Sequence, residues 1–227
     1  EYYQTYKGTK TQDAIAQVFS GGGVLAGTSA GMAMLSGVMF TAKNGTVYPE
    51  ECIENPQNSY ITLADDFLDV FPGWVFDTHV AERGRLPRSL GFMANWYLNH
   101  EAHINAVSLD DMTALAIDTG MQATVYGTGA ARILLSGENT TYRTNNSRLI
   151  AQNVQVHQLL QGWGYHFESG NISTPGAETQ TLPDRDEHGA YTILASGTNN
   201  RAYFDAMISR FIEGFGDKDD PVLVIHG

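Results

Sequence analysis

The chain has 227 residues and carries 25 acidic against 13 basic side chains, for a net charge of −12. This acidic excess argues against nucleic acid as a partner, and no apolar run is long enough to span a bilayer. The single cysteine, Cys52, excludes an internal disulfide and a cysteine-based zinc site. The length fits one domain, or one domain with an appendage.

The compartment is indicated only by composition. The chain is rich in Asn and Thr and poor in Lys, which favours an exported protein, secreted or periplasmic. The first residues, Glu1-Tyr2-Tyr3-Gln4, are not typical of a signal peptide. They fit a chain that was processed or cut from a longer one.

The first half of the chain predicts helices and strands in alternation. Apolar spacing predicts a helix from Thr11 to Phe19, which Gly21-Gly22-Gly23 ends. The elements expected next are a strand over 24–26, a helical stretch over 32–35, a polar loop over 43–59 that could form a mobile flap, a buried strand over 74–76, and a helix starting near Pro87.

The second half predicts short strands and a closing β-α-β unit. Apolar runs separated by glycines indicate strands over 104–107, 113–117, 123–126 and 131–135, with a polar turn region over 139–147 and one or two closing strands over 149–160. Residues 170–189 are polar and predict a linker. A strand over 191–194, a helix over 199–211 and a strand over 222–225 then imply a parallel sheet. The class is therefore α/β.

The segment Gly27-Thr28-Ser29-Ala30-Gly31 lies between an apolar strand and a helix. Strand, tight turn and helix are the context of a nucleophile elbow. The serine would sit at a helix N-terminus, where free N–H groups favour developing negative charge. The alternative is a glycine-rich turn whose serine only caps the helix.

A serine nucleophile needs a base and an orienting acid. His79 follows a predicted strand and is the best base; Asp110 and Asp111 follow another and could supply the acid, or could merely end that strand. Ligands collect beyond the carboxyl ends of parallel strands, so these residues should converge with Ser29. The nearby arginines could bind a carboxylate, or could lie on a solvated loop: Arg83, Arg85 and Arg88.

Three segments, in order, resemble the cyanophycinase / dipeptidase E family of serine peptidases. Gly27-Thr28-Ser29-Ala30-Gly31 is similar to the family's Gly-Thr-Ser-Ala-Gly-Ala elbow. The stretch from Asp77 to Arg88 resembles its Asp-Gln-His-Phe-x-x-Arg-x-Arg-x-x-Arg block. The stretch from Leu109 to Leu115 resembles its Ile-Asp-Glu-x-Thr-Ala-Leu block.

The resemblance implies a class I glutamine-amidotransferase-like, or flavodoxin-like, fold: a three-layer α/β sandwich with a mostly parallel sheet. It implies Ser29 as nucleophile, His79 as base and Asp111 as acid, with a one-residue ambiguity toward Asp110. The Ala30 N–H would belong to the oxyanion hole. The positions linked to substrate recognition are Asp77, Thr78, Arg83, Arg85 and Arg88. No metal and no organic cofactor is implied.

The chain departs from the family pattern in three ways. Thr78 replaces a glutamine, which puts specificity for cyanophycin in doubt, and Asp111 replaces a longer glutamate. The family's opening, with its Gly-Gly-Asp-Gln segment, is absent before Tyr2, whereas residues 191–227 resemble such an opening. We therefore expect a peptidase core over 1–169, a linker or excursion over 170–189 and a β-α-β unit over 190–227, in a chain that is permuted or part of a longer one.

The leading hypothesis is a serine-type peptidase that hydrolyses small acidic or isoaspartyl-type peptides through an acyl-enzyme. The expected partner is a small peptide, not nucleic acid or a membrane, and a homodimer is left open. The alternative is a catalytically degenerate binding or surface protein on the same scaffold. An esterase of the α/β-hydrolase type ranks third, because there the acid precedes the histidine in the chain.

Overall fold

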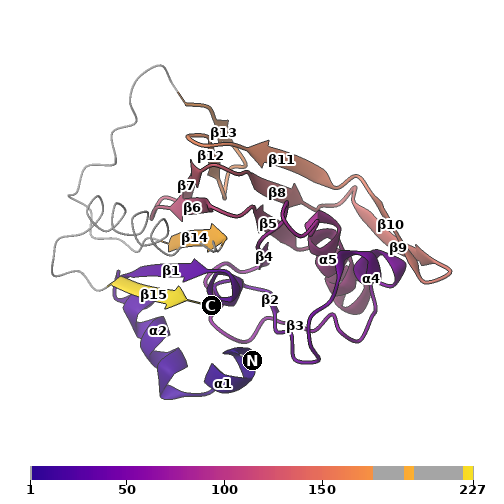
Figure 1. The fold of residues 1–227 in the computed structure, drawn as a ribbon, viewed down its shortest axis with the longest axis horizontal. Helices are drawn as coiled ribbons and strands as arrows, with labels where there is room; N and C mark the ends of the chain where they lie inside the picture. Colours follow the sequence, from indigo (N-terminus) through magenta and orange to yellow (C-terminus); the bar gives the residue numbers. More distant parts are fainter. Residues whose placement is uncertain (1, 176–191, 197–221, 227) are drawn as a thin grey trace.

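The computed structural model describes residues 2–175, 192–196 and 222–226 of the chain. Two β-sheets form its centre (Figure 1). The larger sheet contains β1 (Val24–Thr28), β6 (Thr113–Ile117), β7 (Gln122–Gly127), β12 (Gly164–His166), β13 (Ile172–Ser173), β14 (Thr192–Ser196) and β15 (Val222–His226), in the order β13-β12-β7-β6-β14-β1-β15. The smaller sheet contains β4 (Trp74–Asp77), β5 (Asn105–Leu109), β8 (Ala131–Leu135) and β11 (Gln155–Leu159), in the order β11-β8-β5-β4.

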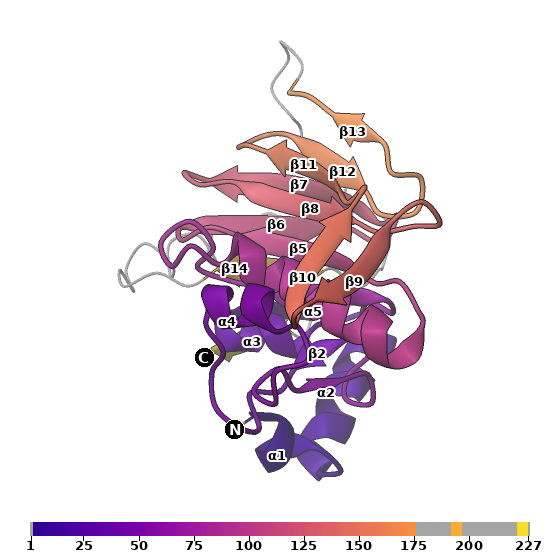
Figure 2. The same ribbon diagram turned by 90° about the vertical axis from the view of Figure 1, so that its right-hand side faces the viewer.

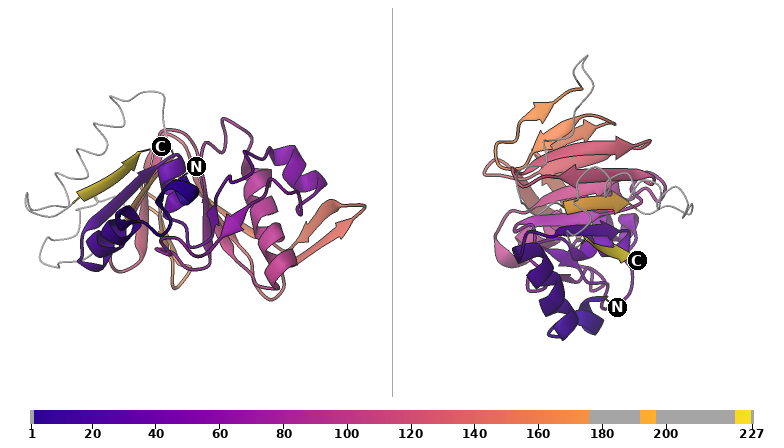
Figure 3. Two further views of the ribbon diagram at one scale, coloured as in Figure 1. Left: turned by 90° about the horizontal axis from the view of Figure 1, so that it is seen from below. Right: turned by 90° about the vertical axis from the view of Figure 1, so that its left-hand side faces the viewer.

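Two short pairs of strands and five helices accompany these sheets in the described part of the chain. β9 (Thr141–Asn145) and β10 (Arg148–Gln152) form a hairpin that extends beside helix α5 (Figure 3). The other pair is β2 (Met39–Phe40) with β3 (Leu63–Ala64). The helices are α1 (Tyr2–Tyr6), α2 (Lys10–Ser20), α3 (Ala30–Met34), α4 (Pro49–Glu54) and α5 (Leu86–His100), and α1 lies with α2 at one end of the molecule (Figure 2).

The prediction of a mostly parallel, flavodoxin-like sandwich is wrong. Parallel pairing is confined to β14-β1-β15 and to β4-β5, and the other described pairs are antiparallel. The cause is the length of the connections. Only residues 118–121 join β6 to β7, whereas a parallel connection needs a crossover of about a dozen residues or more.

The positions of the individual helices and strands agree better with the expectations than the pairing directions of the strands do. Helix α2 and the strands predicted over 24–26, 74–76, 104–107, 113–117, 123–126 and 131–135 are present. The strands predicted at 191–194 and 222–225 are β14 and β15; both run parallel to β1, which lies between them. The helix predicted over 199–211 lies outside the described residues, as does most of the linker predicted over 170–189.

Two segments differ from the prediction. The loop expected over 43–59 contains α4, which is capped where Glu51 accepts a hydrogen bond from the Tyr48 N–H at 2.8 Å and is anchored by the buried Cys52. Residues 49–54 therefore form a short packed helix, whereas the rest of the segment is irregular as expected. The polar turn expected over 139–147 forms β9, because Tyr142 is buried against α5 and fixes that strand.

The core consists of two main layers that follow the period-two alternation of strands. In the smaller sheet, Phe76, Val107 and Ile133 face the larger sheet, in one cluster with Leu115 and Val125. The residues adjacent to them in sequence face the other side of the sheet and pack in a cluster with α5: Val75, Ala106 and Leu134. The smaller sheet is therefore covered on both faces, by a sheet and by a helix.

This arrangement brings the ends of β4 and β5 to one edge of the smaller sheet. β4 and β5 are parallel, with Asp77 opposite Ser108, so the residues after both strands emerge at one edge. The chain then crosses from β5 to β6, in the other sheet, through residues 110–112. Parallel pairing was expected of most of the sheet. It is present between β4 and β5, where it brings the residues that follow Asp77 and Leu109 to the same edge.

Candidate active site

Ser29 occupies a strained turn between β1 and α3. Its backbone has φ 52° and ψ −121°, a region that residues other than glycine rarely adopt and that is often found at functional sites. Gly27 permits the close approach of strand and helix, because a Cβ there would lie 2.4 Å from the Gly31 carbonyl oxygen. The Ser29 side chain makes no capping hydrogen bond to α3, so the serine is not a simple helix cap.

Three segments far apart in the sequence form one chain of hydrogen bonds. The Ser29 Oγ lies 2.9 Å from Nε2 of His79, and His79 Nδ1 bonds to Oδ1 of Asp111. When Nδ1 carries the proton and donates a hydrogen bond to the carboxylate, Nε2 is unprotonated and accepts a hydrogen bond from the serine hydroxyl. His79 also has a positive φ, of 56°. The order of groups is that of a serine-histidine-acid triad.

Asp110 has a different role from its neighbour. It is buried, and its carboxylate accepts the N–H of Ala81 at 2.9 Å and the N–H of Ala130 at 3.0 Å. It also pairs with the guanidinium of Arg132. Ala81 lies two residues after His79, so Asp110 ties the histidine loop to β8. The geometry therefore assigns the imidazole contact to Asp111 and the support of the loop to Asp110.

Asp110→Asn is expected to lower kcat/KM by about tenfold to a hundredfold, with KM little changed. An amide at this position turns one acceptor oxygen into a donor that faces an N–H, so the loop that carries His79 loses one of its ties. Steady-state kinetics checks this, with the exposed Asp65→Asn as the matched variant. Equal rates for Asp110→Asn and the native protein would contradict the positioning role.

The electrostatics of His79 favour its neutral form. Burial is the largest influence and lowers the pKa of the imidazole below its usual 6.5, with Arg83 and Arg85 acting in the same direction. The Asp111 carboxylate opposes this by raising the pKa, through its charge and its hydrogen bond. Near neutral pH the imidazole is therefore unprotonated and ready to act as a base.

We expect the acidic limb of the profile of kcat/KM against pH to have its midpoint below pH 6.5. A base must be unprotonated to act, and the His79 pKa is lowered, so activity persists down to that pH and is lost only below it. In Arg83→Ala the limb should move to higher pH, because a cation that lowers the His79 pKa is removed. A pH-rate profile whose acidic limb lies above pH 7 in the native protein would contradict this.

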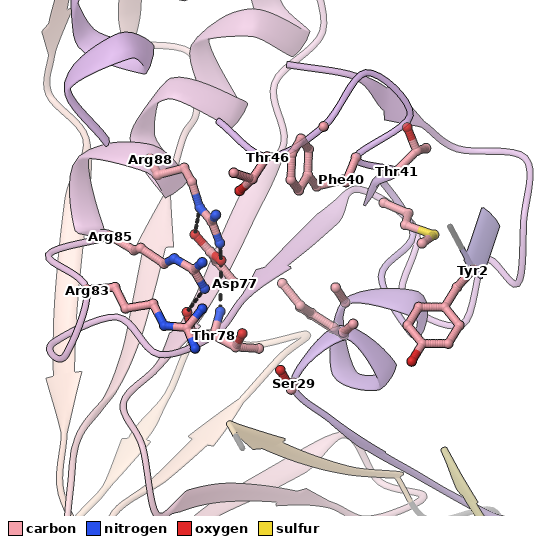
Figure 4. A pocket seen from close by; sticks show the side chains of 16 residues that line it. Tyr2, Ser29, Phe40, Thr41, Thr46, Asp77, Thr78, Arg83, Arg85 and Arg88 are labelled. Carbon is pink, nitrogen blue, oxygen red and sulfur yellow. Dashed lines mark hydrogen bonds and ion pairs between the residues drawn. The ribbon is translucent and has the colours of Figure 1, made fainter. Parts of the chain in front are cut away.

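A pocket of about 410 Å³ opens beside Ser29 (Figure 4). It is lined by Tyr2, Ser29, Ala30, Ala33, Met39, Phe40, Thr41, Ala42, Gly45, Thr46, Phe76, Asp77, Thr78, Arg83, Arg85 and Arg88. The nucleophile candidate and all five positions predicted for substrate binding thus share one cavity. Ala30 follows Ser29 as the first residue of α3, and the amides of a first helical turn have no partner within the helix.

Asp77 and Arg88 are engaged with each other. Both side chains are buried, and the Arg88 Nε donates to Asp77 Oδ2 at 2.9 Å within a two-point ion pair. Asp77 also accepts from the Thr78 N–H at 2.8 Å and from the Ser89 hydroxyl at 3.3 Å. The pair forms a wall of the pocket and leaves little capacity for a ligand.

Arg85 and Arg83 are more accessible. Arg85 is half-buried and donates to the Thr78 carbonyl at 3.0 Å. Burial, together with the neighbouring Arg88, lowers the pKa of its guanidinium to about 10, so it remains charged at neutral pH. Arg83 is exposed at the mouth of the pocket. These two side chains are the ones placed to meet an anionic group.

Two residues of the site were not predicted from the sequence. Glu82 accepts the Asp111 N–H at 3.0 Å and joins the acid to the histidine loop. Tyr2 lines the pocket from α1, although it precedes Ser29 by 27 positions and has no chemical partner nearby in the sequence. Glu82 could have been found from its place within the arginine-rich stretch, but Tyr2 could not.

Other histidines have structural partners. His100 stacks on Trp96 at 3.9 Å between ring centroids, and His103 Nδ1 lies 2.6 Å from the Ser136 hydroxyl oxygen. Among residues 2–175, 192–196 and 222–226, no group of three or more His, Cys, Asp or Glu side chains is arranged to hold a metal ion. The helices described also include none with the length and apolar character needed to cross a bilayer.

Comparison with known proteins does not assign a family to the chain. A scan against models of protein families found no match, and neither did a search of curated proteins.

Proposed function

We propose that this protein is a serine-type peptidase of the cyanophycinase-like family that hydrolyses small acidic or isoaspartyl-type peptides through an acyl-enzyme. The observation that carries the proposal is the hydrogen-bonded series from Ser29 through His79 to Asp111. This series lies beside a pocket that is lined in part by arginine side chains. The three family-like segments of the sequence supply the residues of the series and the arginines of the pocket.

The geometry supports a two-step reaction. The Ser29 Oγ attacks the scissile carbonyl carbon while His79 Nε2 takes the hydroxyl proton, and Asp111 stabilises the imidazolium that forms. We assign the Ala30 N–H, at the start of α3, to the developing oxyanion. The imidazolium then protonates the leaving amine, the C–N bond breaks, and an ester to Ser29 remains. Water, deprotonated by His79, hydrolyses this ester.

The end of β15 lies next to the nucleophile. In the parallel register between β1 and β15, His226 pairs with Thr28, the residue that precedes Ser29. The proposal therefore assigns the second donor of the oxyanion hole to backbone at this end of the larger sheet, beside Ala30.

The charge distribution supports an acidic substrate. The protein carries a net charge of −12, which repels long anionic polymers, yet two accessible guanidinium groups lie in the pocket. Guanidinium groups match carboxylates in shape and charge. Thr78 stands where the family has a glutamine, and its carbonyl is bound by Arg85. We therefore favour a short acidic peptide over cyanophycin itself.

Arg83→Ala tests the substrate class. We expect KM for aspartyl dipeptides to rise by about tenfold, with kcat reduced less, because the lost interaction is made in the ground state as well as the transition state. Arg143→Ala is the matched control, since Arg143 is also exposed but lies on the β9–β10 hairpin. An unchanged KM for acidic peptides, or equal hydrolysis of acidic and neutral dipeptides by the native protein, would contradict an acidic substrate.

A further inference from the structure

The pocket beside Ser29 has two chemically different ends. In Figure 4, Arg83 and Arg85 lie on one side of Ser29, and Tyr2 lies on the other. The first end is cationic. The second is formed by an aromatic ring together with small and apolar side chains, among them Ala33 and Met39. A peptide that reaches the Ser29 hydroxyl from this pocket therefore meets both kinds of surface.

The aromatic end is built into the fold. The Tyr2 ring is half-buried and stacks on Tyr6 of the same helix, with centroids 6.0 Å apart and ring planes 10° from parallel. The tyrosines of α1 pack on a cluster made by Met34, Met39 and Phe67. This packing restrains the ring before any ligand binds, which reduces the entropy lost on binding.

The floor between Ser29 and Tyr2 consists of small residues. Ala30 and Ala33, on the first turns of α3, line the pocket and are half-buried. Side chains of this size leave room beside the scissile bond for a large neighbouring group. The aromatic end thus offers both space and apolar surface, and a carboxylate has no cation to meet there among the residues that line it.

We propose that this end of the pocket is a subsite for an aromatic or long apolar side chain. The preferred substrate would then be a short peptide with an acidic residue on one side of the scissile bond and an aromatic or long apolar residue on the other. This inference rests on the proposed peptidase function and narrows its substrate class. Tyr2 is the specificity-determining residue in it.

Matched dipeptides test the subsite: Asp-Phe against Asp-Ala, and Phe-Asp against Ala-Asp, with α- and β-linked forms of the first pair. We expect the phenylalanine member of the cleaved pair to have a kcat/KM about tenfold higher, a typical discrimination for an apolar pocket. Tyr2→Ala should remove that preference, so that kcat/KM for the phenylalanine member falls to that of the alanine member. Tyr2→Phe, which keeps the ring, and Gln4→Ala, which changes an exposed residue of α1, should retain it.

A binding measurement separates this inference from the proposed function. Calorimetry with Ser29→Ala compares the affinities of the same peptides without turnover. A preference for phenylalanine that depends on Tyr2 supports the subsite even if the native protein hydrolyses none of the peptides, in which case only the peptidase proposal fails. Equal binding and equal turnover of the phenylalanine and alanine members would overturn the subsite, as would a preference that survives in Tyr2→Ala.

Discussion

Ser29→Ala should reduce kcat for acidic dipeptides by about 10⁴-fold to 10⁶-fold while the protein remains folded. The loss is large because members of a triad act as a unit, so removal of the nucleophile alone eliminates most of the acceleration that the unit provides. The fold should persist, because alanine preserves the Cβ and the Ser29 side chain makes no capping hydrogen bond to α3. Initial rates and a circular dichroism spectrum check both parts.

The control for this substitution is Ser59→Ala, which removes an exposed hydroxyl far from Ser29 in the sequence. It should leave kcat and KM unchanged. If Ser29→Ala hydrolysed the peptides as fast as the native protein, Ser29 would not be the nucleophile, whatever its distance from His79.

Asp77→Ala should destabilise the fold by about 3–5 kcal/mol, the range found when one partner of a buried ion pair is removed. Both side chains of the pair are about 95 % buried. The substitution leaves the Arg88 guanidinium in the interior without its carboxylate and removes the acceptor of Ser89. Urea unfolding measured by fluorescence gives the change in the free energy of unfolding.

Two further variants serve as controls for Asp77→Ala. The double variant Asp77→Leu with Arg88→Met should recover most of the lost stability, since apolar groups of similar volume often replace a buried pair without penalty. Asp66→Ala, which breaks the exposed pair of Asp66 with Lys7, should have little effect. If Asp77→Ala were as stable as Asp66→Ala, the pair would not support the pocket wall.

The elements nearest the site could be predicted from the sequence because their signals are local. Glycines on both sides of Ser29 and an apolar run before it indicate a strand, a turn and a helix, and the structure has β1, the strained turn and α3 there. His79 and Asp111 each follow strongly apolar strands. Which of Asp110 and Asp111 meets the imidazole could not be predicted, because adjacent residues differ only in the direction of their side chains.

The direction of the strands was predicted incorrectly, and the reason is physical. Apolar patterns show that a segment is a buried strand, but pairing direction depends on the connections and on distant partners. The β-rich stretch from β6 to β11 has connections too short for parallel crossovers. The three side chains of the series still lie together despite this error, because that requires only that β4 and β5 be parallel and that β1 end beside them.

Long-range contributions to the site were beyond sequence reasoning. Tyr2 enters the pocket because α1 packs on Met34, Met39 and Phe67, which come from three separate parts of the chain. Arg132 reaches Asp110 across the pairing of β5 with β8. Neither contact leaves a pattern of period or spacing in the sequence.

Reaction with a fluorophosphonate, followed by mass spectrometry of the intact protein and its peptides, tests the central claim most directly. A serine activated by His79 should form one covalent adduct per chain, located on Ser29, and the adduct should be absent in Ser29→Ala and form much more slowly in His79→Ala. A protein that takes up no probe, or that carries it elsewhere and reacts equally well as Ser29→Ala, would contradict the account.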